Sequence, residues 1–528
     1  MENRKTKIIS VVAVVALALT VITATYAYFQ AQVGDPAATD IKVSANTVDT
    51  FTFSNGSAIS FSINQDNFAS GKGNQTGSTY ASATLTANNK TNTATEHYYM
   101  YLNIENNTFT YSINTNTPEI IMTVKNSVGN EVTDISTLNH VIVTGANGTQ
   151  VSGYDITNKS GLITLFDNRE ITTTSSKEEK WNITITFVNY DENQNANAGK
   201  SMSAKVMIQK EVIPQVVSDV CSNGTNLATC ITTLANKSIP SATNIYHHDS
   251  SLSNGAGDNS YRYAGASDVV NNFVCFGSNE STCPTDNLYR IIGVFGNNVK
   301  LIKYDYGTTD ELGTDGDYNQ TYKEWGMDST YKGTYGDGER IGVYYWNNTT
   351  QTNTWSESLL NKTNLNTNFI NNIGEEWANK IATTTWKVGG NTYSNIYSKT
   401  PSVVYQNEIV SPVTTNTTDN ATEYTAKIGL MYVSDYGFAA EPSAWTLTIG
   451  NYNNTTATST NWMYMGLYEW TLSRNADRSD DAFIVFGDGN VFGHYVGNDV
   501  AVRPSFSLLS SVTYSKGDGT QNSPIRIN

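Results

Sequence analysis

Oxygen-bearing side chains alternate along residues 315–319, which read Asp-Gly-Asp-Tyr-Asn. Alternating carboxylate and amide oxygens are the ligands with which a calcium-binding loop surrounds its ion. The stretch lacks the turn glycine and the bidentate glutamate that an EF-hand carries at the corresponding positions. We therefore treat Asp315, Asp317 and Asn319 as a candidate calcium site outside the EF-hand class, with an acidic turn as the alternative interpretation. No other cofactor is expected.

A second group with potential chemistry is the run His247-His248-Asp249. Imidazole and carboxylate groups bind metals or relay protons, but neighbouring histidines in a Ser- and Asn-rich stretch are usually just solvated. The sequence contains neither a Gly-x-Ser-x-Gly nucleophile motif nor a P-loop. We therefore expect no enzymatic activity. A secreted hydrolase is kept as a third interpretation, because the two carboxylates of a glycosidase can lie far apart in a chain.

The chain has four cysteines, Cys221, Cys230, Cys275 and Cys283. An even number of cysteines in an exported protein is typical of disulfides. Their close spacing favours Cys221–Cys230 and Cys275–Cys283, although three pairings are formally possible. A zinc site is the alternative, but such sites favour tighter Cys-x-x-Cys pairs.

Aromatic side chains are abundant in the second half of the chain, where eight of the nine tryptophans lie beyond residue 300. Tyrosine and tryptophan rings can stack on sugars while their polar edges stay hydrated. The candidate ligand surface, with a glycan as one candidate ligand, comprises Trp462, Tyr464, Tyr468, Trp470 and Tyr495. The alternative is that most of the tryptophans form a core.

The N-terminus resembles an export signal. Three basic residues within the first seven precede an apolar run over residues 8–24, and small residues follow at Thr25 and Ala27. This pattern predicts a signal peptide, residues 1–27, cleaved after Ala27. A retained membrane anchor is the alternative, since the run approaches the roughly 20 residues that span a bilayer. Both interpretations place residues 28–528 outside the cytoplasm, with membrane contact only through the N-terminal segment.

The charge balance restricts the partners. Thirty-two basic residues against forty-eight acidic ones give a net charge of −16, and charged residues make up only 15% of the chain. Binding to a phosphate backbone requires clustered lysine and arginine, so nucleic acid is excluded as an expected partner. An extracellular ligand, either a glycan or a host or matrix protein, is expected instead.

Two-residue alternation dominates residues 28–212. Ile59, Phe61 and Ile63 alternate with serines, and similar series recur along the segment. Many short strands with one apolar face each predict a jelly-roll-like β-sandwich. The turn Asn55-Gly56 between two of these series predicts a β-hairpin.

The sequence pattern changes near residue 213. Residues 213–257 are rich in turn formers and are expected to be a disulfide-bearing linker. Residues 258–528 mix strands with helical patterns and predict an α+β domain. Within it Phe369, Ile373, Trp377 and Ile381 recur at four-residue spacing, which predicts a helix. The chain as a whole is therefore expected to be mainly β.

The aromatic residues around the cleavage site, with strands at 180–189 and 199–208 behind them, resemble the TasA/camelysin family of Gram-positive matrix proteins. The resemblance covers residues 1–212. It implies secretion, a sandwich fold and, in some members, fibres built by donating an N-terminal strand to the next subunit. Camelysins have been classed as metalloproteases, but the sequence has no His-Glu-x-x-His motif, so that activity is not carried over.

A second series of motifs lies at 258–263, 274–277, 288–293, 429–437 and 517–520. It resembles an uncharacterised domain of surface proteins from low-GC gut bacteria. Glu469-Trp470-Thr471, followed by Val502-Arg503-Pro504, is also similar to the formylglycine-generating branch of the C-type-lectin-like fold. That similarity implies a lectin-like fold for residues 258–528 without catalysis, since no cysteine follows Cys283 to supply the branch's reactive pair.

These observations favour a secreted or cell-surface bacterial protein that acts in adhesion or ligand binding. The second interpretation is a structural subunit of an extracellular matrix fibre or pilus-like assembly. In that case the segment 28–48, in which Ile41, Val43 and Ala45 alternate with polar residues, supplies a strand for self-association.

Overall fold

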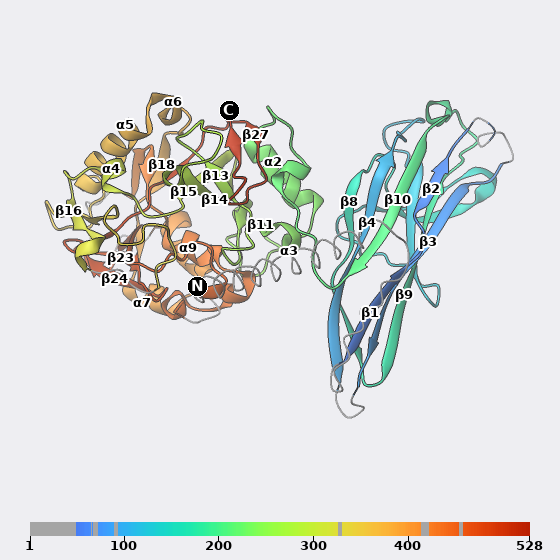
Figure 1. The fold of residues 1–528 in the computed structure, drawn as a ribbon, viewed down its shortest axis with the longest axis horizontal. Helices are drawn as coiled ribbons and strands as arrows, with labels where there is room; N and C mark the ends of the chain where they lie inside the picture. Colours follow the sequence, from blue (N-terminus) through green and yellow to red (C-terminus); the bar gives the residue numbers. More distant parts are fainter. Residues whose placement is uncertain are drawn as a thin grey trace, which may run out of the picture. The chain divides into compact units, whose positions relative to one another are not determined.

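The computed structural model describes residues 49–528 except 65, 67–71, 89–92, 326–329, 413–421 and 454–457. The chain divides into two compact units between Ile213 and Pro214. Strands dominate the first unit, and the second mixes strands with short helices (Figure 1). Over the described residues of both units together, strand residues exceed helical ones, so the expectation of a mainly β fold is confirmed.

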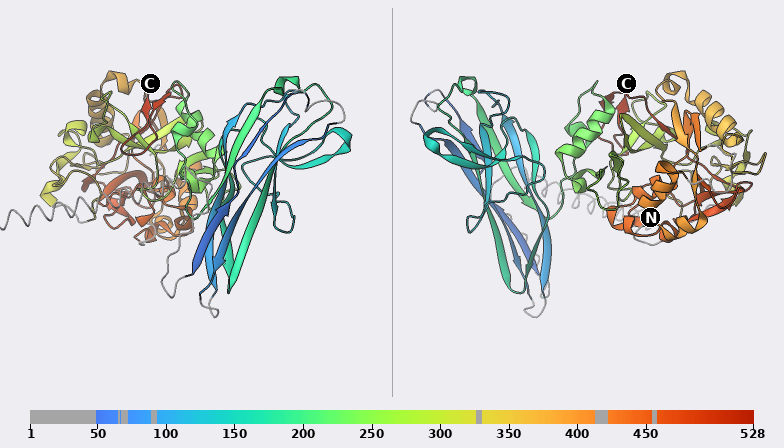
Figure 2. Two further views of the ribbon diagram at one scale, coloured as in Figure 1. Left: turned by 45° about the vertical axis from the view of Figure 1, so that its right-hand side comes forward. Right: turned by 180° about the vertical axis from the view of Figure 1, so that it is seen from behind.

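The first unit is a β-sandwich of two antiparallel sheets (Figure 2). One sheet has the order β1 (Thr50–Asn55), β3 (Gln75–Thr86), β9 (Ser176–Phe187), β5 (Ile120–Asn126), β7 (Gln150–Asp155) and β6 (His140–Thr144). The other has the order β2 (Ile59–Ser62), β10 (Ser201–Gln209), β4 (Ala94–Asn107) and β8 (Gly161–Thr173). Alternate residues of each strand, such as Ile183 and Ile185 of β9 and Leu102 of β4, fill the core between the sheets.

The predicted hairpin at Asn55-Gly56 is wrong. Strand β1 pairs with β3, and β2 pairs with β10 in the opposite sheet, so the chain changes sheets between Asn55 and Ile59. The backbone N–H of Gly56 donates to the carbonyl of Tyr80, 2.8 Å away, which prolongs the pairing of β1 with β3. A local turn signal could not distinguish a hairpin from a corner of the sandwich, because both bring apolar alternation back to the same core.

The second unit contains two large sheets that share one core. The first has the order β11 (Ile245–His248), β12 (Ser260–Tyr263), β14 (Leu288–Phe295), β15 (Asn298–Lys303), β26 (Ser505–Ser507) and β21 (Ile428–Gly429), with β13 (Phe273–Cys275) on β14. The second has the order β16 (Tyr318–Thr321), β17 (Gly342–Tyr345), β25 (Asp499–Ala501), β22 (Glu469–Asn475), β23 (Asp481–Val485) and β24 (Val491–Tyr495), with β19 (Gly390–Asn391) on β22. Two small sheets pair β18 (Thr384–Lys387) with β20 (Glu423–Ala426) and β27 (Tyr514–Lys516) with β28 (Arg526–Ile527).

Short helices surround these sheets. They are α2 (Leu227–Lys237), α3 (Pro240–Thr243), α4 (Thr309–Leu312), the π-helix η7 (Leu360–Phe369) continued by α5 (Ile370–Ile373), α6 (Glu375–Ala378), α7 (Tyr393–Ser398), α8 (Pro401–Tyr405) continued by the π-helix η8 (Gln406–Val410), and α9 (Val433–Ala439). The helix predicted from Phe369 to Ile381 is interrupted at Gly374, whose φ of 84° favours glycine.

The predicted linker, residues 213–257, belongs to the second unit from Pro214 onward. Leu227, Ile231 and Leu234 of α2 are buried in the main core of that unit. Their spacing of four and then three residues gives α2 one apolar face, and packing this face fixes the segment to the sheets.

Two disulfides are present, and they are the pairs favoured by spacing. Cys221–Cys230 joins Cα atoms 5.6 Å apart, and Cys275–Cys283 joins Cα atoms 5.8 Å apart. Among the described residues, no helix is both long enough and apolar enough to cross a membrane, and the apolar run at 8–24 lies outside them.

Candidate ligand-binding site

Three of the five predicted ligand-binding aromatics are core residues. Trp462 and Trp470 are at most 1% exposed, and their Nε1–H groups donate to the carbonyls of Tyr263 and Tyr344, each 2.8 Å away. Tyr464 is also buried, with its hydroxyl donating to the carbonyl of Gly487. A ring buried in this way cannot stack on a ligand, which corrects the expectation for these three.

Tyr468 and Tyr495, the other two predicted residues, are partly exposed. The ring of Tyr468 lies 4.8 Å from that of Phe486, and Phe486 lies 5.3 Å from Phe492 on β24. Tyr468 therefore begins a row of aromatic side chains that runs toward β24, whereas Tyr495 occupies the end of that strand.

The row ends in the most exposed aromatic pair among the described residues of the second unit. Tyr393 and Tyr397 lie four residues apart on α7 and are 46% and 49% exposed. Their ring centroids are 6.3 Å apart and their planes differ by only 13°. Phe492 contacts both rings, at 6.4 Å and 5.7 Å, and we call these three residues the tyrosine platform.

Local sequence explains why the two tyrosines share a direction. The hydroxyl oxygen of Thr392 accepts the backbone N–H of Asn395 at 3.2 Å and caps α7. Helical residues at i and i+4 lie on the same face, so Tyr393 and Tyr397 project together. Asp477 accepts the backbone N–H of Tyr393 at 2.9 Å and fixes the start of the helix. The sequence analysis missed the pair, although its four-residue spacing after a capping threonine was visible.

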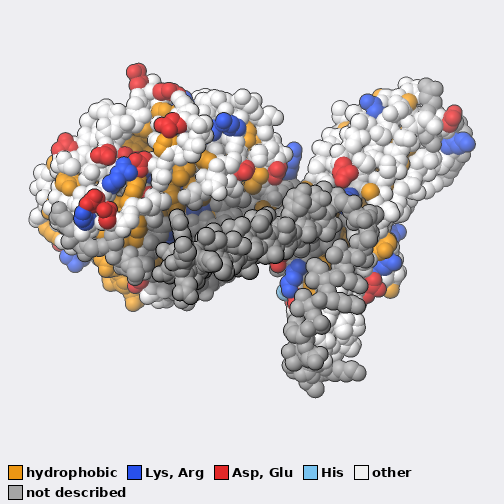
Figure 3. Space-filling model, in the orientation of Figure 1, with side chains coloured by type: hydrophobic (Ala, Val, Ile, Leu, Met, Phe, Trp, Pro, Cys, Tyr) orange, Lys and Arg blue, Asp and Glu red, His pale blue; other side chains and the backbone are white. Residues whose placement is uncertain are grey.

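Uncharged side chains dominate the surface of the second unit that is visible in Figure 3, where hydrophobic side chains emerge between uncharged polar ones. The charged side chains on that face are scattered and of both signs. Such a surface favours contacts through rings and hydroxyl groups over long-range electrostatic attraction.

The three candidate calcium ligands turn toward separate partners. Asp317 is buried, and its two carboxylate oxygens accept the backbone N–H groups of Asn348 at 3.1 Å and Leu360 at 2.8 Å. Asp315 accepts from the side chain of Asn368, and Asn319 donates to a carboxylate oxygen of Asp499.

Because Leu360 opens η7, Asp317 caps that helix, where a negative charge is favourable. Burial nevertheless raises the pKa of Asp317. Within the described residues, no three His, Cys, Asp or Glu side chains come together as a potential metal site. Calcium binding at residues 315–319 stays a prediction.

The two adjacent histidines face different surroundings. His248 is buried between the rings of Phe438 and Trp445, and its Nδ1 accepts the backbone N–H of Ala256 at 3.0 Å. Burial lowers the pKa of His248 to about 2, so the ring is neutral. His247 instead stacks on Tyr261, 4.2 Å away. Successive residues of a strand point to opposite faces, so the two imidazoles do not form one site.

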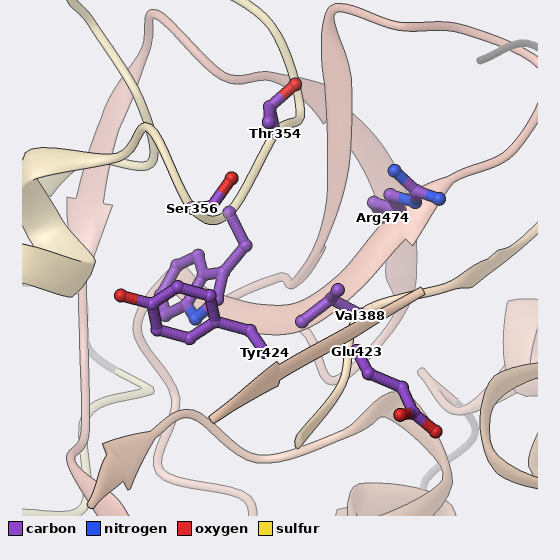
Figure 4. Close-up of a pocket in the computed structure, with 7 residues that line it drawn as sticks. Thr354, Ser356, Val388, Glu423, Tyr424 and Arg474 are labelled. Carbon is purple, nitrogen blue, oxygen red and sulfur yellow. The ribbon is translucent and has the colours of Figure 1, made fainter. Parts of the chain in front are cut away.

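A pocket opens on the second unit where the β18–β20 sheet approaches the end of β22 (Figure 4). The hollow is small, with a volume of about 10 Å³ that has room for about one water molecule. Its lining residues are Thr354, Trp355, Ser356, Val388, Glu423, Tyr424 and Arg474.

Arg474 is held in this pocket by its backbone. Gly390 of β19 pairs with Arg474 of β22, and a Cβ on Gly390 would lie 1.6 Å from the carbonyl oxygen of Arg474. A glycine is therefore required for the two strands to approach. Arg474 is only 3% exposed, and its Nη2 is buried without a hydrogen-bond partner.

No protein-family model matches the sequence, and no curated protein sequence matches it significantly.

Proposed function

We propose that the chain is a secreted or cell-surface bacterial protein that binds glycans without catalysis and serves in adhesion. In this proposal the second unit is the binding part, and its likeness to the C-type-lectin-like fold belongs to the same hypothesis. The observation that carries the proposal is the pair of exposed, nearly parallel rings of Tyr393 and Tyr397.

Two parallel rings on one face suit the C–H face of a sugar. Covering an exposed aromatic ring with a ligand removes apolar surface from water, which is favourable. The side chains lose little conformational freedom on binding, because they rotate about only two bonds. Contact with Phe492 and the capped start of α7 hold Tyr393 and Tyr397 in place before a ligand arrives. Preorganisation of this kind lowers the entropic cost of binding.

The cysteine chemistry supports an extracellular location. The chain forms two disulfides. Disulfides persist in oxidising compartments and are rare in the cytosol of most cells. The predicted signal peptide supports the same location from the sequence.

The test is a glycan array probed with the purified secreted protein and with a Tyr393→Ala, Tyr397→Ala variant. We expect the wild type to bind a subset of glycans and the variant to lose at least about tenfold in affinity. A Tyr393→Phe, Tyr397→Phe variant should keep most of the binding, because stacking needs the ring and not the hydroxyl. Leu509→Ala, at another exposed apolar side chain, is the matched control. Equal binding by the alanine variant, or no glycan bound by any form, would refute the proposal.

A fibre subunit is the second candidate, and an open sheet edge favours it. Among the described strands, β1 has β3 as its one neighbour. An edge strand presents unpaired backbone groups to which another strand can add. The segment expected to provide that strand, 28–48, lies outside the described residues.

A further inference from the structure

We propose that Lys300 and Asp435 join in a spontaneous isopeptide bond, an amide between the Nζ of Lys300 and the Cγ of Asp435. Lys300 lies on β15, and Asp435 lies in the first turn of α9, 135 positions further along the chain. The bond ties a strand of one large sheet of the second unit to this helix. Neither residue belongs to the tyrosine platform, so the proposal is independent of glycan binding.

The two side chains meet in a buried ion pair. The Nζ of Lys300 donates to Oδ2 of Asp435 over 2.5 Å, and the two side chains are 8% and 3% exposed. Within the described part of the chain, no other lysine–carboxylate ion pair has both members so deeply buried. Because Oδ2 is bonded to Cγ, the contact also holds the nitrogen close to the carbon that it would attack. Groups held together in this way react as if at very high concentration.

Contacts at the start of α9 fix the carboxylate of Asp435. Its Oδ2 also accepts the backbone N–H of Tyr432 at 3.0 Å, and its Oδ1 lies 3.5 Å from Nη1 of Arg262. The carboxylate therefore cannot turn away from the lysine without losing these contacts. A guanidinium beside Oδ1 stabilises the negative charge that this oxygen gains when an amine attacks Cγ.

Aromatic rings surround the amino group of Lys300. Nζ lies 4.6 Å from the ring centroid of Tyr432, 5.3 Å from that of Trp386 and 5.8 Å from that of Phe295. Burial lowers the pKa of Lys300. A desolvated lysine gives up its proton more readily, and the neutral amine is the nucleophilic form. The same enclosure keeps bulk water away from the reacting groups.

A third buried group, Glu408 of η8, carries protons in this cluster. Its carboxylate accepts the hydroxyl of Ser473 and the backbone N–H of Ser434, the residue that precedes Asp435. Burial raises the pKa of Glu408 to about 7, and the charge of Asp435 adds to the shift. An acid with a pKa near neutrality both donates and accepts protons efficiently.

The reaction is a condensation that needs no further reagent. Lys300 passes one proton to Asp435, which gives a neutral amine and a neutral carboxylic acid. Nζ then attacks Cγ, and the bond between Cγ and Oδ2 breaks. Glu408 donates a proton to the departing oxygen and takes one from the nitrogen, so it ends unchanged. The products are an amide that bears one N–H and one molecule of water.

The bond removes two charges from the core. The desolvation of a buried ion pair costs free energy that the mutual attraction of the charges often does not offset. A neutral amide avoids this cost. A covalent link across 135 positions also restricts the unfolded chain, as a disulfide does, and so stabilises the second unit.

Mass spectrometry of the purified secreted protein tests the bond. After reduction of the disulfides, we expect the intact mass to be lower than the mass calculated for the mature sequence by one water molecule. A tryptic digest should contain one branched peptide that joins the segments of Lys300 and Asp435, with no cleavage after Lys300. A wild-type protein with the full calculated mass, or a cross-link between two other residues, overturns the proposal.

Three variants assign the two ends of the bond. Lys300→Arg keeps a positive charge but should show its full calculated mass. Asp435→Asn should lose ammonia instead of water, because nitrogen then replaces oxygen in the leaving group. Lys303→Arg is the matched control, since Lys303 is also buried but pairs with the partly exposed Glu311, and it should lose water as the wild type does. Loss of water in Lys300→Arg or Asp435→Asn, or the full mass in Lys303→Arg, would reject the assignment.

Glu408→Gln tests the proton carrier. We expect the variant to form the bond at least about tenfold more slowly, followed by intact mass at fixed times after cell-free synthesis under oxidising conditions. Glu408→Asp should recover part of the rate, because it restores the acid. Circular dichroism of each sample confirms that slow bond formation occurs in folded protein. A folded Glu408→Gln variant that forms the bond at the wild-type rate would remove Glu408 from the proposal.

Discussion

Arg503 and Glu469 form a fully buried ion pair, with Nε donating to Oε1 over 2.8 Å. Arg503 also donates from Nη2 to the carbonyl of Met463 at 2.7 Å. Arg503 follows Glu469 by 34 positions, and the two residues belong to separate sequence motifs. The pair connects the start of β22 to the segment between β25 and β26 and thereby joins the two large sheets of the second unit.

Breaking this pair should destabilise the second unit. Arg503→Met leaves a buried carboxylate without its partner, and removal of one member of a buried pair typically costs about 3–5 kcal/mol. Replacing both residues in an Arg503→Met, Glu469→Leu variant should restore part of that loss. Denaturant unfolding of the two variants measures the difference. If the double variant is no more stable than the single one, the loss of stability comes from the hydrogen bonds of Arg503 to carbonyl groups such as that of Met463, and not from the charge pair.

Glu408 lies in a second buried polar network. Its carboxylate accepts the hydroxyl of Ser473 and the backbone N–H of Ser434. Asp435 and Lys300, which are ion-paired with each other, are the charged groups that act on it. Burial raises the pKa of Glu408 to about 7.

This pKa predicts a stability that falls as pH rises. Folding favours the protonated form of Glu408, so its contribution is fully present below the ordinary pKa of 4.5 and is lost as pH passes 7. The loss amounts to roughly 3 kcal/mol, at about 1.4 kcal/mol per pKa unit. The free energy of unfolding is measured against pH for the wild type and for Glu408→Gln. The difference between the two curves isolates the contribution of Glu408, which other titrating groups would otherwise mask. A flat difference between pH 5 and 8 would contradict the raised pKa.

The Cys221–Cys230 disulfide should stabilise the segment that contains α2. It closes a loop with a sequence separation of 9, and a loop of that size contributes about 2–3 kcal/mol by restricting the unfolded chain. A Cys221→Ala, Cys230→Ala variant should therefore unfold at a lower denaturant concentration. The Cys275→Ala, Cys283→Ala variant is the matched control, with a separation of 8. An unchanged midpoint for the first variant would show that packing of Leu227 and Ile231 is sufficient.

The sequence predicted the features that depend only on residues close together in the chain. Alternation located strands such as β9, because a half-buried strand must alternate wherever it pairs. Close spacing located the disulfides, because short loops bring cysteines together. The same rules failed at Asn55-Gly56, where the partners of the two flanking strands, β3 and β10, lie elsewhere in the chain.

The candidate sites depend on contacts between distant segments. Residues 354–356, 388 and 423–424 line the hollow beside Arg474, and the sequence does not reveal that environment. Trp462 and Trp470 look like ligand-binding residues by type, yet their indoles donate to carbonyls some 199 and 126 positions away and are buried by those contacts.

Self-association through the segment 28–48 gives the last prediction. If this segment adds to the open edge of β1 on a neighbouring molecule, light scattering of the secreted protein should show oligomers that grow with concentration. A variant that begins at Asp49 should then remain monomeric. Val43→Pro should also prevent assembly, because proline removes a backbone donor from the added strand, whereas Val43→Thr keeps that donor and is the matched control. If every form stays monomeric at high concentration, the fibre hypothesis is rejected. Equal assembly by wild type and Val43→Pro would instead place the contact outside this segment.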